Sequence, residues 1–172
     1  KKEINDWLSL KVGRFYVAFG TLYDSHRPDQ YLTSSRSRAE TTLLPGVWDE
    51  MGLSLFADFG ITEFTLQVVN GLDSTGFSSQ HWIGSGHQGR FEQIRADSLA
   101  VVVRSDTDLP DDGVLGVSLY AGDTVGARPK DDIEGSAYLV LTEAHAKVNF
   151  GNVSFNSGLI WGHLQSADVI SD

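Results

Sequence analysis

Charged and polar side chains recur at every second position in several segments, which is the spacing that places them together on one face of a β-strand. Glu143, His145 and Lys147 follow this spacing within residues 134–150. A carboxylate beside an imidazole is a candidate pair of metal ligands. No third ligand and no nucleophile accompanies the pair, so the sequence predicts no catalytic residue, no metal site and no cofactor, and the protein is not expected to be an enzyme.

A second set of charges lies in residues 21–47, a long polar segment between two apolar ones. Opposed acidic and basic groups on either side of a narrow passage create a transverse field, which discriminates solutes by charge and dipole. The simpler interpretation is a set of solvated loop charges that pair locally. The charges are Asp24, Arg27, Asp29, Arg36, Arg38 and Glu40.

Two apparent motifs fail when their spacing is checked. GSGHQG at 84–89 has the glycine spacing of a dinucleotide site but lies in no strand–helix unit, so it is interpreted as a loop. DTDLPDDG at 106–113 resembles a calcium loop, but Pro110 and Asp111 occupy positions that need a ligand and a glycine, which favours a turn.

Composition narrows the class of partner. The 172 residues include 18 glycines, four prolines and no cysteine, with a formal net charge of −10. Only 13 basic residues are present, and they are scattered, which argues against nucleic acid as a partner. No apolar run approaches the length of a transmembrane helix, and the first ten residues lack the apolar core of a signal peptide.

The pattern elsewhere is that of strands. Apolar and polar residues alternate in about seven segments, and the apolar phase switches in the first, near Gly13, and in the sixth. A switch of phase in the first segment predicts a bulge near Gly13. The segments are 7–20, 48–60, 62–77 (ending its alternation at Asn70), 97–106, 113–123, 134–150 and 152–162.

Long and short connections alternate between these segments, as they do in outer-membrane barrels, where turns at one end are short and loops at the other are long. The apolar faces are aliphatic in mid-strand and aromatic near the ends, which predicts two girdles at the bilayer interfaces. One girdle would hold Trp7, Phe59, Phe64, Phe150 and Phe155, and the other Phe19, Trp48 and Trp161. The opposite faces are too polar for a dry core, which favours a water-filled lumen.

Several longer stretches then resemble one family. GRFYVAFG (13–20), SHRP (25–28), ETTLLPGVWDEMGLSLF (40–56) and VVNGLDSTGF (68–77) are similar to segments of the phosphate-selective porin O and P family of bacterial outer-membrane proteins. The likeness continues more loosely through LTEAHAKVNF to about residue 164. Two departures are Ala18, where the family has proline, and loops without a dense set of lysines and arginines.

The resemblance implies an all-β chain that forms part of an antiparallel transmembrane β-barrel, about seven strands of about 16–18. An odd strand number leaves edges unpaired in lipid, so residues 1–172 are expected to be one barrel segment, incomplete at both ends.

It also implies a porin, which is a homotrimer in the outer membrane of a Gram-negative bacterium, surrounded by lipid and lipopolysaccharide. Such a channel lets small hydrophilic solutes or ions, including phosphate and other oxyanions, diffuse through a lumen narrowed by an inward-folded loop.

The alternative interpretation is a soluble all-β ligand-binding module, sandwich or lectin-like, that holds a ligand in its long loops. The candidate residues for the lining or constriction of a pore are those charged side chains expected on the polar strand faces or in the first long loop. They are Arg27, Arg36, Arg38, Glu40, Glu50, Arg104, Glu143, His145 and Lys147.

Overall fold

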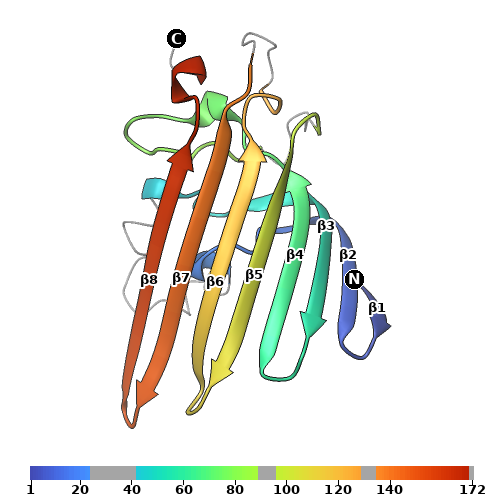
Figure 1. The fold of residues 1–172 in the computed structure, drawn as a ribbon, viewed down its shortest axis with the longest axis vertical. Coiled ribbons are helices and arrows are strands. Elements are labelled where there is room, and N and C mark those ends of the chain that lie inside the picture. Colours follow the sequence, from blue (N-terminus) through green and yellow to red (C-terminus); the bar gives the residue numbers. More distant parts are fainter. Residues whose placement is uncertain (24–41, 89–95, 129–134, 171–172) are drawn as a thin grey trace.

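The computed structural model describes residues 1–23, 42–88, 96–128 and 135–170. Eight antiparallel strands in these ranges form one open sheet, in chain order from β1 to β8 (Figure 1). They are β1 (Lys2–Asn5), β2 (Leu8–Tyr16), β3 (Asp49–Asp58), β4 (Thr62–Asn70), β5 (Leu99–Leu109), β6 (Gly113–Asp123), β7 (Tyr138–Phe150) and β8 (Val153–Leu164). Short 3-10 helices lie at η1 (Thr21–Tyr23), η3 (Ser74–Gly76) and η4 (Ala167–Ile170). No helix within the described ranges is long and apolar enough to cross a membrane.

The prediction of an all-β, antiparallel chain is confirmed, but the number of strands is wrong by one. The additional strand is β1, which pairs with β2 through a register shift between Glu3 and Asn5. Its four residues are all exposed, and Ile4 is its one apolar member. A segment this short has no alternation to detect, so only its pairing with β2 reveals it.

The turns and loops divide between the two ends of the sheet. Short turns at 59–61, 110–112 and 151–152 connect strands at one end, here called the short-turn end. Segments 17–48, 71–98 and 124–137 leave and re-enter the sheet at the other, the long-loop end. Figure 1 shows this arrangement, with the described parts of the long connections gathered behind the upper half of the sheet.

The two faces of the sheet differ in chemistry. The face that the connections leave uncovered, here called the outer face, is apolar and exposed: Leu159 is 73% exposed, Val117 53% and Leu119 39%. The face that the connections cover, the inner face, carries the polar side chains. Its buried polar members include Glu50, Ser54, Thr65, Gln67, Arg104, Ser118, Glu143 and His145.

The inner face also contains a packed apolar core, at the long-loop end, where the sequence predicts a face too polar for one. Side chains of β4 to β7 meet apolar residues of the connections there, and the sequence could not show that these connections fold back onto the sheet. The cluster comprises Phe15, Val17, Ala18, Phe19, Leu44, Trp48, Val69, Leu72, Ile83, Ala100, Val102, Tyr120, Leu139 and Leu141.

This core explains the two switches of apolar phase, and the predicted bulge near Gly13 is wrong. The register of β2 with β3 runs without a break from Leu8 opposite Ala57 to Tyr16 opposite Asp49. Gly13 has φ +118°, a conformation that glycine adopts readily. The phase switches because the inner face is polar near the short turns and apolar beneath the connections, where Phe15 and, on β7, Leu139 and Leu141 are buried.

The same core buries two members of one of the predicted aromatic girdles. Trp7, Phe59, Phe64, Phe150 and Phe155 are all exposed near the short turns, and the Trp7 and Phe59 rings stack with centroids 5.7 Å apart. Phe19 and Trp48, assigned to the opposite girdle, are instead 2% and 8% exposed within the core. At the long-loop end an aromatic residue near a strand can serve the core or the surface, and the sequence pattern is the same for both.

The exposure of β1 predicts an uneven resistance to local unfolding. Amide hydrogens of Lys2–Asn5 should exchange with solvent at least tenfold faster than those of β5 and β6, which are hydrogen-bonded on both sides. Hydrogen exchange followed by mass spectrometry measures both. Equal protection of β1 and β6 would show that β1 is hydrogen-bonded on both sides and is not an edge of the sheet.

Candidate functional site: a charge network on the inner face

The candidate residues differ in where the structure places them. Arg27, Arg36, Arg38 and Glu40 lie outside the described residues. The others lie in β3, β5 and β7, on the inner face, but with very different access to solvent: Glu50, Arg104, Glu143 and His145 are buried, whereas Lys147 is exposed. Of these, the structure brings Arg104, Glu143 and His145 into one network. Glu50, at the start of β3, is buried outside it.

Arg104 lies at the centre of this network and is 1% exposed. Its Nε donates a hydrogen bond of 2.5 Å to Oδ2 of Asp106, two residues along β5 and therefore on the same face. Its Nη1 donates to the carbonyl oxygen of Gly20, 2.6 Å away, and its guanidinium lies 5.1 Å from the centre of the Tyr23 ring. A buried guanidinium is tolerated only when its charge and its donors find partners, and these contacts supply them.

His145 continues the network from β5 to β7. Its Nε2 lies 3.1 Å from Oδ1 of Asp106, and its Nδ1 lies 3.0 Å from Oε1 of Glu143. Both ring nitrogens therefore lie within ion-pair distance of carboxylate oxygens, and Nε2 also lies 3.4 Å from Nη2 of Arg104. Glu143 Oε2 also accepts a hydrogen bond of 2.9 Å from the hydroxyl of Ser118 on β6.

A glycine makes room for this arrangement. Gly116 and Gly158 are the register partners of His145, on β6 and β8 respectively. A Cβ at Gly116 would overlap Oδ1 of Asp106 and the ring of His145, whereas a Cβ at Gly158 would meet its neighbours at ordinary van der Waals distances. The close approach of Asp106 to His145 therefore depends on the absence of a side chain at Gly116.

The chemistry open to this network is limited. The Ser118 hydroxyl accepts from the amide of Gly20 and donates to Glu143, so no base is positioned to activate it as a nucleophile. Within residues 1–23, 42–88, 96–128 and 135–170, no group of three or more His, Cys, Asp or Glu side chains is placed to hold a metal. Arginine and carboxylates compensate one another's charge here, which suits a supporting network better than a reactive centre.

The sequence identified three members of the network and missed three. Asp106 lies two residues after Arg104 and therefore on the same face of the strand, so the spacing Arg-x-Asp could have identified it from the sequence. Ser118 and Gly116 show no signal of their own, because their roles arise from the register that places Ser118 opposite Glu143 and Gly116 opposite His145.

Gly116→Ala is expected to lower the free energy of unfolding by about 1–3 kcal/mol, because the new methyl group must displace the His145 ring and the Asp106 carboxylate. Gly158→Ala, on the other side of His145, is the matched control and should cost much less. Urea unfolding measures both. Equal destabilisation by the two variants would contradict the packing around His145.

Comparison with known proteins gives one distant relative. No family model matches the chain, and no solved structure matches it. A protein of Aquifex aeolicus (strain VF5), named only as an uncharacterized protein, is 26% identical over 162 residues, which cover 93% of this chain and 33% of the relative. The chain therefore spans about a third of the length of the relative that it matches.

Proposed function

We propose that this chain forms part of the wall of an outer-membrane porin, a channel through which small hydrophilic solutes or ions diffuse passively. The outer face of the sheet contacts lipid, and the inner face borders a water-filled lumen. Residues 17–23, which lie over the inner face, narrow that lumen. No covalent step is involved, since the channel only lowers the cost of moving a hydrated solute across an apolar layer.

The observation that supports this proposal most strongly is the inverted distribution of polarity across the sheet. Large apolar side chains on the outer face are exposed along β2 to β8, while the inner face carries most of the charged side chains of these strands. Water-soluble domains rarely expose apolar patches of this extent. The exposed set includes Val12, Met51, Leu53, Phe64, Leu99, Val101, Leu115, Val117, Leu119, Tyr138, Phe155, Leu159 and Trp161.

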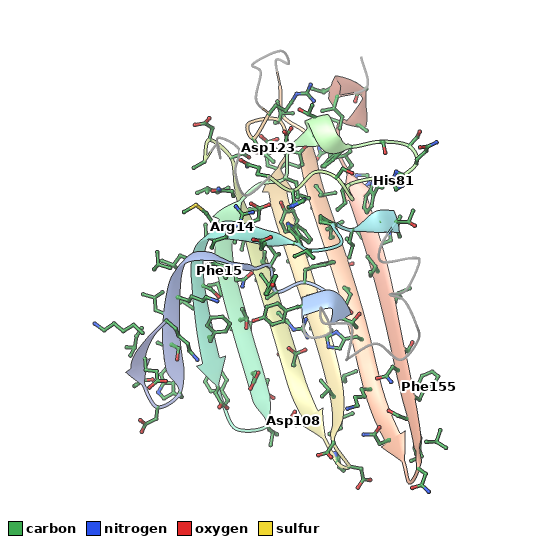
Figure 2. All side chains as sticks on the ribbon, turned by 180° about the vertical axis from the view of Figure 1, so that it is seen from behind. Arg14, Phe15, His81, Asp108, Asp123 and Phe155 are labelled. Atoms are coloured by element: carbon green, nitrogen blue, oxygen red, sulfur yellow. The ribbon has the colours of Figure 1, made fainter. Side chains whose placement is uncertain are left out.

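The part of the inner face nearer the short turns carries exposed polar side chains, which supports the proposal that it borders water. Lys147 on β7, Asp108 on β5 and Asn156 on β8 are exposed there, beyond the covering connections. Figure 2, drawn from behind, shows Asp108 near the short-turn end, clear of the segments that cover the upper half of the sheet. Charged and amide groups in this position remain hydrated if the space beside them holds water.

The proposed channel is not assigned to phosphate alone. The resemblance favours phosphate or other oxyanions, which clustered arginines would bind. Each arginine among the described residues is already bonded within the protein: Arg14 to Asp49, Arg104 to Asp106, and Arg128 to Ser74. The proposal is therefore a pore for small hydrophilic solutes, with a homotrimer and surrounding lipopolysaccharide as further parts of the same porin hypothesis.

Single-channel recording tests the proposal. The intact protein, purified in detergent and added to a planar lipid bilayer, should give discrete, ohmic conductance steps. A salt gradient across the bilayer then gives the sign of ion selectivity from the reversal potential. Absence of steps from protein shown to be folded and inserted would remove the channel function.

A pair of substitutions on one strand tests the lipid-facing assignment. Leu159→Lys places a charge on the outer face of β8, and Asn156→Lys places the same charge on its inner face. In a bilayer the first should cost about 2–4 kcal/mol if Leu159 lies near the midplane, and the second should cost little.

Folding of both variants into lipid vesicles, followed by the mobility shift of the folded form on gels, gives the comparison. A soluble ligand-binding module would tolerate both lysines equally, because both positions are exposed to the same solvent in that case.

A further inference from the structure

The described part of the first long connection is held across the inner face by its main chain. The Ala18 amide donates to Oε1 of Gln67 on β4, 2.9 Å away, and the Gly20 amide donates to the hydroxyl of Ser118 on β6, 3.1 Å away. Between these strands, Arg104 on β5 donates to the Gly20 carbonyl at 2.6 Å. Side chains of β4, β5 and β6 therefore hold the backbone of residues 18–20, which crosses the inner face.

These contacts belong to side chains that are themselves fixed. Gln67 also donates to the Tyr16 carbonyl and to Ser54, at 3.2 and 3.3 Å. Ser118 can accept from Gly20 because its own hydrogen is donated to Glu143. Each of these side chains is at most 5% exposed, so the crossing segment is held by groups with little rotational freedom.

The charge network connects two of these anchoring side chains. Asp106, His145 and Glu143 form a chain of contacts from the guanidinium of Arg104 to the hydroxyl of Ser118. Both ends of that chain meet the same residue, Gly20: one at its carbonyl and one at its amide. Gly20 has φ +68°, the left-handed conformation in which glycine presents both groups without strain.

We infer that Gln67, Arg104 and Ser118 are positioning residues that anchor residues 18–20 on the inner face. Residues 18–20 are themselves buried, so in this inference they set the width of the pore by holding the segment that follows them, with the partly exposed Thr21 and Tyr23, in the lumen. In this inference Arg104, Glu143 and His145 support the constriction and do not filter solutes, since solutes cannot reach groups that are at most 9% exposed. The effect on the width of the pore rests on the proposed function, whereas the anchoring of residues 18–20 does not.

Two variants each remove one of the two side chains that bind Gly20. Arg104→Met keeps a side chain of similar length but deletes the donors to Gly20 and Asp106. Ser118→Ala is a smaller change, which deletes only the contacts to Gly20 and Glu143, and it serves if Arg104→Met folds poorly. Lys11→Met is the control: it removes one positive charge from the inner face, where Lys11 lies over the Phe15 ring, without touching residues 18–20.

Hydrogen exchange of the Ala18 and Gly20 amides in detergent-solubilised protein is the first measurement. The Gly20 amide should exchange slowly in the unmodified protein and in Lys11→Met, and at least tenfold faster in Arg104→Met and Ser118→Ala. Unchanged exchange in both anchor variants would overturn the anchoring, whether or not the protein conducts.

Single-channel conductance and the largest polyethylene glycol that enters the pore are the second measurement. Both should rise in the anchor variants, whereas polymer exclusion should stay unchanged in Lys11→Met, which alters the charge of the inner face but none of the anchors. Faster exchange with unchanged conductance and polymer exclusion would overturn the constriction while leaving the pore intact. Absence of conductance in the unmodified protein would instead refute the pore, and with it the constriction, while the exchange result would still decide the anchoring.

Discussion

The two-residue period of the β-strand is the constraint on which the rest of this structure depends. Because β2 to β8 pair in unbroken register, every alternate side chain in each strand reaches the same face of the sheet. A one-residue slip of β6 would exchange Val117 and Leu119 with Ser118, and would break the contact of Ser118 with Glu143. Register therefore fixes the apolar outer face and the charge network together.

The inner face combines a dry, apolar region with a polar region. Near the long loops it is dry, with Leu139, Leu141 and Val102 packed against the covering connections. Further along the same strands it becomes polar, and the transition occurs at Arg104 and Glu143, whose charges are buried but compensated. The described parts of the covering segments stop there, and Lys147 beyond them is exposed. The charge network thus marks the boundary between packed protein and solvent.

The sequence predicted what depends on local alternation and failed where distant segments meet. Strand positions and the polar face of Glu143, His145 and Lys147 followed from parity. The burial of Phe19 and Trp48 did not, because it depends on connections that fold back onto the sheet. Within the candidate site, Asp106 meets His145 only through the pairing of β5, β6 and β7, with Gly116 between them. No pattern within one segment carries that information.

Spin labelling tests most directly whether lipid contacts the outer face and water the inner face. The chain has no cysteine, so a single cysteine at position 159 or 156 accepts one label without further changes. In lipid vesicles, a label at 159 should collide more with oxygen, which concentrates in the bilayer, and a label at 156 more with a water-soluble nickel chelate. Equal preference for the nickel chelate at both positions would contradict the account, because both faces would then be in water.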